Sequence, residues 1–81
     1  MPVVDKAFAT VLRRLRIQKG LSQEAFGFEV GIHRTYVSQL ERGLKSPPLR
    51  VLYRVSQTLD VKMSKLVALI ENELAARKRR K

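Results

Sequence analysis

Residues 21–43 read LSQEAFGFEVGIHRTYVSQLERG and contain start and stop signals for two short helices. Ser22 is a good N-cap for a helix that ends at Gly31, because its hydroxyl can accept hydrogen bonds from backbone amides of the first turn. A second helix fits the residues from about His33 to Glu41. Gly31 lies between the two helices, where a tight turn favours a positive φ. The stretch therefore predicts two short helices joined by a tight turn.

Three more helices flank this pair, and no segment has the alternation of a strand. The first is expected from about Lys6 to Lys19, with Asp5 as its N-cap and Gly20 at its end. Ser46-Pro47-Pro48 is a break, because a residue that precedes proline avoids the helical conformation. A fourth helix follows at about Leu49 to Leu59, and a fifth runs into the basic end of the chain. The predicted fold class is therefore all-α, with five helices.

Apolar residues recur at helical spacing in every predicted helix, which identifies the faces expected to form the core. These residues are Phe8, Val11, Leu12 and Leu15, then Ala25, Phe26 and Val30, then Val37 and Leu40, then Leu49, Leu52, Val55, Ser56 and Leu59, and finally Met63, Leu66, Val67, Ile70 and Leu74. The last two helices have more apolar surface than a small domain buries, and we interpret the excess as a homodimer interface. Its residues are Tyr53, Val67, Leu69, Ile70 and Leu74. Burial within one chain and simple exposure are the alternatives.

Length and composition restrict the class of protein. The 81 residues suffice for one domain, placed at 1–76 with the fifth helix at about 63–76, before a basic C-terminal tail at 77–81. The tail is expected to be disordered, with non-specific phosphate contact as the alternative. Lys and Arg number 17 against 7 acidic residues, a net charge of +10. Such an excess favours a polyanionic partner, with nucleic acid first and an anionic membrane surface second.

The sequence gives little support for a metal, cofactor or catalytic site. The chain has no Cys and one His, so we expect no disulfide, no metal and no cofactor. We see no carboxylate pair, nucleophile or phosphate-binding loop, and therefore expect no catalytic residues and no small-molecule ligand. The apolar stretches are shorter than the roughly 18 residues of a membrane span, and the N-terminus lacks a signal pattern. A cytoplasmic, nucleoid-associated protein is expected.

The paired helices resemble the helix-turn-helix of the Cro and lambda-type repressor (Xre-type) family. With Gln23 as the first position of the motif, Gly27 is the fifth, where two helices cross too closely for a large side chain. Gly31 is the ninth, at the turn. Val37 and Leu40 are the fifteenth and eighteenth, and both point into the core. The resemblance continues into the flanking helices and includes short stand-alone members such as restriction-modification controller proteins.

This resemblance implies that the helix from His33 to Leu40 lies in the major groove of DNA. Among its outward residues, Arg34 suits guanine and Gln39 suits adenine, because each can form a bidentate pair with a base edge. Thr35 offers a hydroxyl or a methyl group. These three are the predicted base readers. Residues predicted to contact the DNA backbone are Gln23, His33, Tyr36, Ser38, Arg42, Lys45 and Arg50.

Two further implications concern residues that would support the site. The family's counterparts of Arg16 and Glu41 form a partly buried salt bridge, which here would fix the pose of the recognition helix; an exposed pair is the alternative. His33 stands where the family often has a Ser or Thr cap, and we expect a surface or capping role for it rather than a ligand or catalyst.

The sequence thus predicts a bacterial or phage transcriptional regulator, a repressor or an activator, that binds double-stranded DNA as a homodimer. Its operator would be two-fold symmetric, with half-sites about one helical turn apart. An antitoxin-like interaction module that represses its own operon is one alternative. A membrane-surface protein that uses the basic tail and the amphipathic last helix is another.

Overall fold

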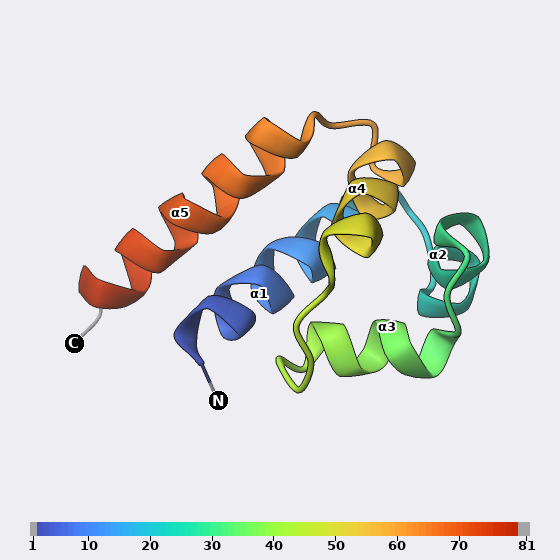
Figure 1. The fold of residues 1–81 in the computed structure, drawn as a ribbon, viewed down its shortest axis with the longest axis horizontal. Coiled ribbons are helices and arrows are strands. Elements are labelled where there is room, and N and C mark those ends of the chain that lie inside the picture. Colours follow the sequence, from blue (N-terminus) through green and yellow to red (C-terminus); the bar gives the residue numbers. More distant parts are fainter. Residues whose placement is uncertain (1, 80–81) are drawn as a thin grey trace.

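Five helices make up the fold in the computed structural model, which describes residues 2–79. They are α1 Val3–Gln18, α2 Gln23–Val30, α3 Arg34–Glu41, α4 Leu49–Thr58 and α5 Met63–Arg79 (Figure 1). No strand occurs among the described residues, so the predicted all-α class with five helices is confirmed. Over the same residues, no helix is long and apolar enough to cross a bilayer.

The start of α1 differs from the prediction. The helix begins at Val3, and Pro2 occupies the N-cap position with no side-chain capping bond. The assignment of Asp5 as N-cap is therefore wrong: this residue lies inside the first turn and is 9% exposed. Its carboxylate accepts a hydrogen bond from the Oγ of Ser46, which lies 41 residues further along the chain. A partner so distant in sequence leaves no local signal.

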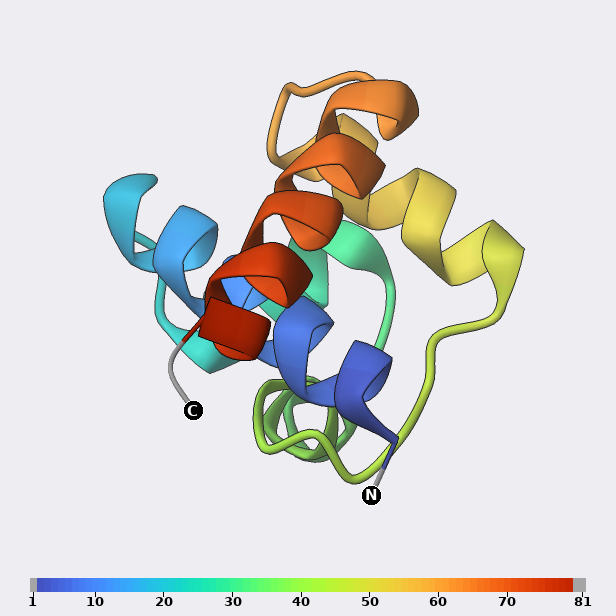
Figure 2. The same cartoon turned by 90° about the vertical axis from the view of Figure 1, so that its left-hand side faces the viewer.

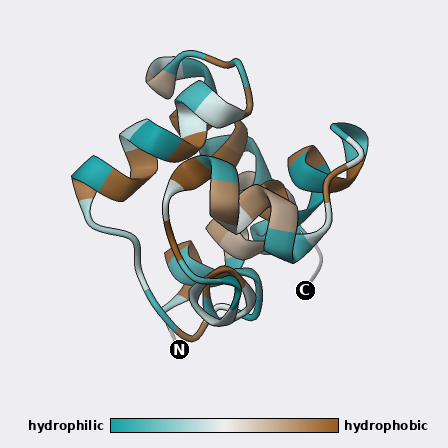
Figure 3. Cartoon of the chain, turned by 90° about the vertical axis from the view of Figure 1, so that its right-hand side faces the viewer, coloured by the Kyte–Doolittle hydropathy of each residue, from teal (hydrophilic) through white to brown (hydrophobic). Residues whose placement is uncertain are grey.

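The core is built from all five helices. Its buried members are Ala7, Phe8, Val11, Leu12, Phe26, Val30, Val37, Leu40, Val51, Val55, Leu59, Leu66 and Ile70. Figure 3 shows hydrophobic and hydrophilic residues alternating along α4. The prediction failed in α4, where Leu49 is 72% exposed and Val51 is 6% exposed. The inward face of α4 centres on Val55, so the residue one turn earlier, Val51, points inward and Leu49 does not.

Burial also corrects the predicted homodimer surface. Ile70 is 9% exposed and belongs to the core of the single chain, so it is not available at a free surface. Leu69 and Leu74 are partly buried against the core. Val67 and Tyr53 are 42% and 50% exposed. Of the five predicted interface residues, Val67 and Tyr53 are therefore the most exposed; Leu49 of α4, which was not among them, is more exposed still.

The basic end of the chain is helical as far as Arg79, so the expected disorder from residue 77 is wrong. Arg77 lies beside Glu73 with Nε and Oε2 3.2 Å apart, and its Nη2 donates to Oγ1 of Thr10 at 2.8 Å. The bond to Thr10 holds the last turns of α5 against α1. Residues 80 and 81 of the predicted tail lie outside the described residues.

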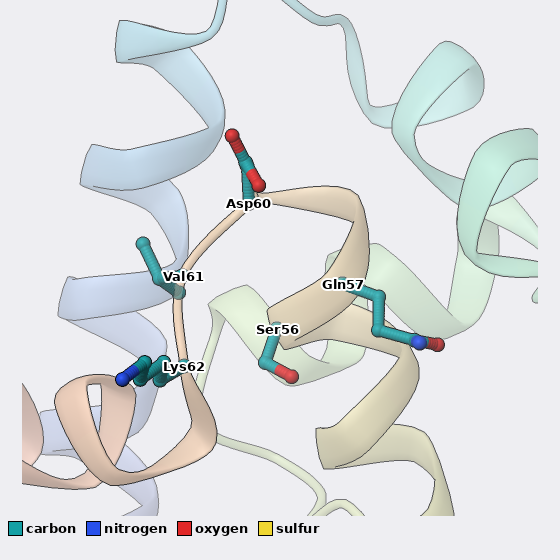
Figure 4. A pocket seen from close by; sticks show the side chains of 5 residues that line it. All are labelled: Ser56, Gln57, Asp60, Val61 and Lys62. Carbon is teal, nitrogen blue, oxygen red and sulfur yellow. The ribbon is translucent and has the colours of Figure 1, made fainter.

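A hollow of about 550 Å³ lies at the turn between α4 and α5 (Figure 4), lined by Ser56, Gln57, Asp60, Val61 and Lys62. Asp60 has a φ of 57° and follows Leu59, the C-cap residue of α4. This turn lies at the top of Figures 1 and 2, and α3 lies at the bottom. The hollow is therefore remote from the predicted recognition helix.

Candidate nucleic-acid interface

The angle between α2 and α3 is set by two glycines. A Cβ added at Gly27 would lie 2.6 Å from the carbonyl oxygen of Ile32 and 3.3 Å from Cγ2 of Val37. Only glycine lets the two helices approach this closely without a shift. Gly31 then turns the chain with a φ of 89°, in the left-handed region. The two helices thus form the tight pair that the motif predicts.

His33 caps the recognition helix α3. Its Nδ1 accepts a hydrogen bond from the backbone N–H of Thr35 at 3.0 Å. In a neutral imidazole the proton is then on Nε2. Because the side chain is exposed, this second nitrogen can donate to an acceptor outside the protein. The same residue can therefore cap the helix and contact a phosphate.

One face of α3 is buried and the other is polar. Val37 and Leu40 are fully buried in the core. At about 100° per residue, Thr35, Ser38 and Gln39 project on the opposite side. Thr35 is exposed, and Ser38 and Gln39 are partly exposed. The helix therefore presents a short row of hydroxyl and amide groups to the outside.

Arg34 lies at the edge of this row, near Glu24 of α2. The nearest distance between Nη1 of Arg34 and Oε2 of Glu24 is 3.8 Å, and the two side chains are 63% and 76% exposed. An exposed pair at this distance contributes at most about 1 kcal/mol. The guanidinium of Arg34 is therefore free to leave Glu24 for a base edge.

Glu41, at the end of α3, connects the recognition helix to α1 and α2. Arg16 of α1 donates to it from Nε at 2.5 Å and from Nη2 at 3.0 Å. Gln23 of α2 donates to its Oε1 from Nε2 at 3.1 Å. The Glu41 side chain is 2% exposed and that of Arg16 is 10% exposed, so the ion pair is buried rather than superficial. Gln23 keeps a second amide hydrogen, which a phosphate oxygen can accept.

The other predicted backbone contacts lie in α3, in the segment that follows it and at the start of α4. Arg42, Lys45 and Arg50 are exposed, and Tyr36 is partly buried against the core. Sequence reasoning missed Arg54, which is also exposed. Its Nη1 lies 3.9 Å from where a Cβ of Gly31 would be, so it reaches the turn between α2 and α3. Arg54 lies one helical turn after Arg50 in α4, and this spacing was the sequence signal that both arginines lie on one side of the helix.

Three of the seven acidic residues are turned inward. Asp5 and Glu73 are buried, and the Glu41 side chain is 2% exposed. Each has a hydrogen-bonding or cationic partner inside the protein. Glu41 and Glu73 are paired with Arg16 and Arg77, which are largely buried themselves, so only Asp5 removes a negative charge from the surface without a positive one. The surface therefore stays strongly positive.

Comparison with known proteins identifies the helix pair. Residues 12–66, more than half of the chain, match the family described as Helix-turn-helix. The chain belongs to this helix-turn-helix family. Within the Xre-type family, its relatives include restriction-modification controller proteins, as the resemblance in the sequence implied.

Three proteins show how far the similarity of this helix-turn-helix regulator extends. The control protein C.MunI from a Mycoplasma species is 37% identical over 67 residues, which are 82% of this chain and 90% of the relative. The controller protein C.AhdI from Aeromonas hydrophila has a TM-score of 0.73 at 37% identity, over 76% of this chain and 90% of its own. The controller protein C.Esp1396I, solved as a tetramer with its 35-base-pair operator, has a TM-score of 0.84 at 21% identity, over 93% and 99%. At that identity the last shows a shared fold.

Proposed function

We propose that this helix-turn-helix regulator binds double-stranded DNA sequence-specifically, with α3 in the major groove. The observation that carries the proposal is the outward row of Thr35, Ser38 and Gln39 on a helix whose opposite face is buried. The width of the major groove admits one α-helix, and hydroxyl and amide groups suit its base edges. We place the protein at the nucleoid, in the cytoplasm.

The proposed role of each residue in DNA binding follows from where it lies relative to α3. Arg34, Thr35 and Gln39 read bases, since Arg34 and Gln39 match guanine and adenine bidentately. A second group surrounds α3 and neutralises or hydrogen-bonds phosphates, which fixes register without reading sequence. Its members are Gln23, His33, Tyr36, Ser38, Arg42, Lys45, Arg50 and, from the structure, Arg54.

The proposed active unit is a homodimer on a two-fold symmetric operator. The operator-bound tetramer of C.Esp1396I supports an oligomer on DNA. For this chain the interface would centre on Val67 and Tyr53, with Leu69 and Leu74 at its edge. Val67→Asp should convert the protein to monomers in sedimentation velocity. Asn72→Asp, which adds the same charge to an exposed position of α5, should not; equal effects of both changes would place the interface elsewhere.

Selection of bound duplexes from a random pool at about 150 mM salt tests the DNA proposal, because non-specific phosphate binding is weak there. Recovery of a symmetric site with half-sites about one turn apart supports both specificity and the dimer. Recovery of one half-site alone would keep the specificity and remove the dimer. An unenriched pool would refute sequence-specific binding.

A further inference from the structure

The loop that joins α3 to α4 carries two cations assigned above to the DNA backbone, Arg42 and Lys45. Both side chains are exposed. An exposed Lys or Arg is held in place chiefly by the backbone that carries it. The positions of these two charges therefore depend on what fixes the loop.

The beginning of the loop is fixed by α1. Glu41, the last residue of α3, is paired with Arg16 at 2.5 Å. Gly43 then reverses the chain with a φ of 74°. A Cβ added at Gly43 would lie 3.6 Å from Cα of Lys6 and 3.8 Å from the carbonyl oxygen of Asp5. The loop backbone thus lies directly against the first turns of α1, as Figure 2 also shows.

The end of the loop is held by a side chain. Lys45 and Ser46 donate no backbone hydrogen bond to a backbone carbonyl of the described residues. Pro47 and Pro48, which follow, have no N–H to donate. Ser46 instead donates from Oγ to Oδ1 of Asp5, whose residue is 9% exposed. A buried carboxylate that does not cap its own helix is thus committed to this loop.

We infer that the hydrogen bond between Ser46 and Asp5 is a tether that positions Arg42 and Lys45 for phosphate contact. Ser46 and Asp5 are positioning residues in this scheme and contribute no charge to the DNA themselves. The inference rests on the proposed DNA-binding function. It predicts that breaking the tether changes the number of phosphates that the protein neutralises, and not only the stability of the fold.

The experiment measures the salt dependence of binding by the full chain to a mixed-sequence duplex of about 30 base pairs, which is long enough for two recognition helices one turn apart. The slope of log K against log salt, between about 50 and 200 mM, changes by about 0.9 for each phosphate that the protein ceases to neutralise. Ser46→Ala removes the donor at an exposed position, so no cavity forms. We expect its slope to be smaller in magnitude by about 1–2, which corresponds to one or two phosphates.

Three further variants test whether the hydrogen bond itself is responsible for the change in slope. Asp5→Ala should reproduce the change, whereas Ser46→Thr keeps a hydroxyl donor, keeps the tether and should keep the wild-type slope. Thr10→Ala is the matched control, because it removes the 2.8 Å bond that ties α1 to Arg77 of α5. Its slope should stay at the wild-type value.

A double-mutant cycle with Lys45→Ala decides whether Ser46 acts through the loop cations. Lys45→Ala alone should lower the slope by about 0.9, and should change it less once Ser46→Ala is present. Fully additive changes would overturn the tether, and so would a Ser46→Ala variant that loses stability in urea yet keeps the wild-type slope. A wild-type protein that binds no duplex would refute the DNA-binding proposal as well, so the two failures are distinguishable.

Discussion

Removing the guanidinium of Arg16 tests how much the buried ion pair contributes to folding. Arg16→Met keeps most of the side-chain volume but strands the Glu41 carboxylate, whose side chain is 2% exposed. The change breaks two hydrogen bonds to Glu41, at 2.5 and 3.0 Å, and one to the carbonyl of Leu21 at 2.7 Å. Breaking one side of a buried pair costs about 3–5 kcal/mol.

A loss of this size is large for the molecule. At about 0.05–0.15 kcal/mol per residue, a chain of this length is stable by about 4–12 kcal/mol. Equilibrium unfolding in urea, followed by circular dichroism, measures the change. With an m-value of about 1–2 kcal/mol per molar, the midpoint should fall by about 1.5–5 M.

Two further variants show whether the loss comes from the stranded Glu41 carboxylate. The double variant Arg16→Met with Glu41→Leu removes both charges and should recover most of the loss. About 1 kcal/mol should remain, since the Leu21 carbonyl and the Gln23 amide lose a partner. Glu24→Gln, in the exposed pair with Arg34, should change stability by less than about 1 kcal/mol. A loss below about 1 kcal/mol in Arg16→Met, or a double variant no more stable than the single one, would refute the reasoning.

The other predictions concern backbone and caps, and urea unfolding measures each. His33→Ala should lose about 1 kcal/mol with the cap of α3, and His33→Ser should not; equal losses would mean that the Nδ1 contact is not a cap. Asp60→Gly should gain about 1 kcal/mol, because a non-glycine residue at φ 57° is strained and its charge opposes the helix dipole; a loss would show that the carboxylate stabilises the turn. Gly27→Ala should lose about 1 kcal/mol net, as overlap with the Ile32 carbonyl outweighs the helix propensity of alanine; a gain would show that α2 and α3 separate easily.

Features that depend on neighbouring residues could be predicted from the sequence. Ser22 accepts from the backbone N–H of Ala25, as an N-cap does, and Gly31 adopts the positive φ expected at the turn. Periodicity likewise placed Phe8 and Leu12 in the core. Caps, turns and helical stripes act within a few residues, so their signals are present in any short window.

Features that depend on distant partners could not be predicted. Asp5 looks like an N-cap, yet its partner is Ser46. Glu73 and Arg77 are four residues apart, the spacing of an ion pair on a helix surface, yet Glu73 is 6% exposed because that part of α5 packs on α1. Leu49 was misplaced for a related reason, since periodicity gives the spacing of a stripe but not which way its centre points.

The candidate site shows the same division. The row of Thr35, Ser38 and Gln39 follows from helical geometry once Val37 and Leu40 are assigned to the core. The link from Gln23 to Glu41 does not, because it requires the angle between α2 and α3. Arg54 was missed because its approach to Gly31 depends on how α4 crosses that pair.

Hydrogen bonds made by α1 explain how a strongly basic chain holds its cations in order. Along this helix, Asp5 binds the loop after α3, Thr10 binds Arg77 of α5, and Arg16 binds Glu41 at the end of α3. The bonds of Asp5 and Arg16 place both ends of the segment 42–45 on one helix. Like charges on a surface repel one another and favour disorder of the loop that carries them. The carboxylates of Asp5 and Glu41 hold this loop, and both are buried. They therefore order the loop without adding negative charge to the surface that would face DNA.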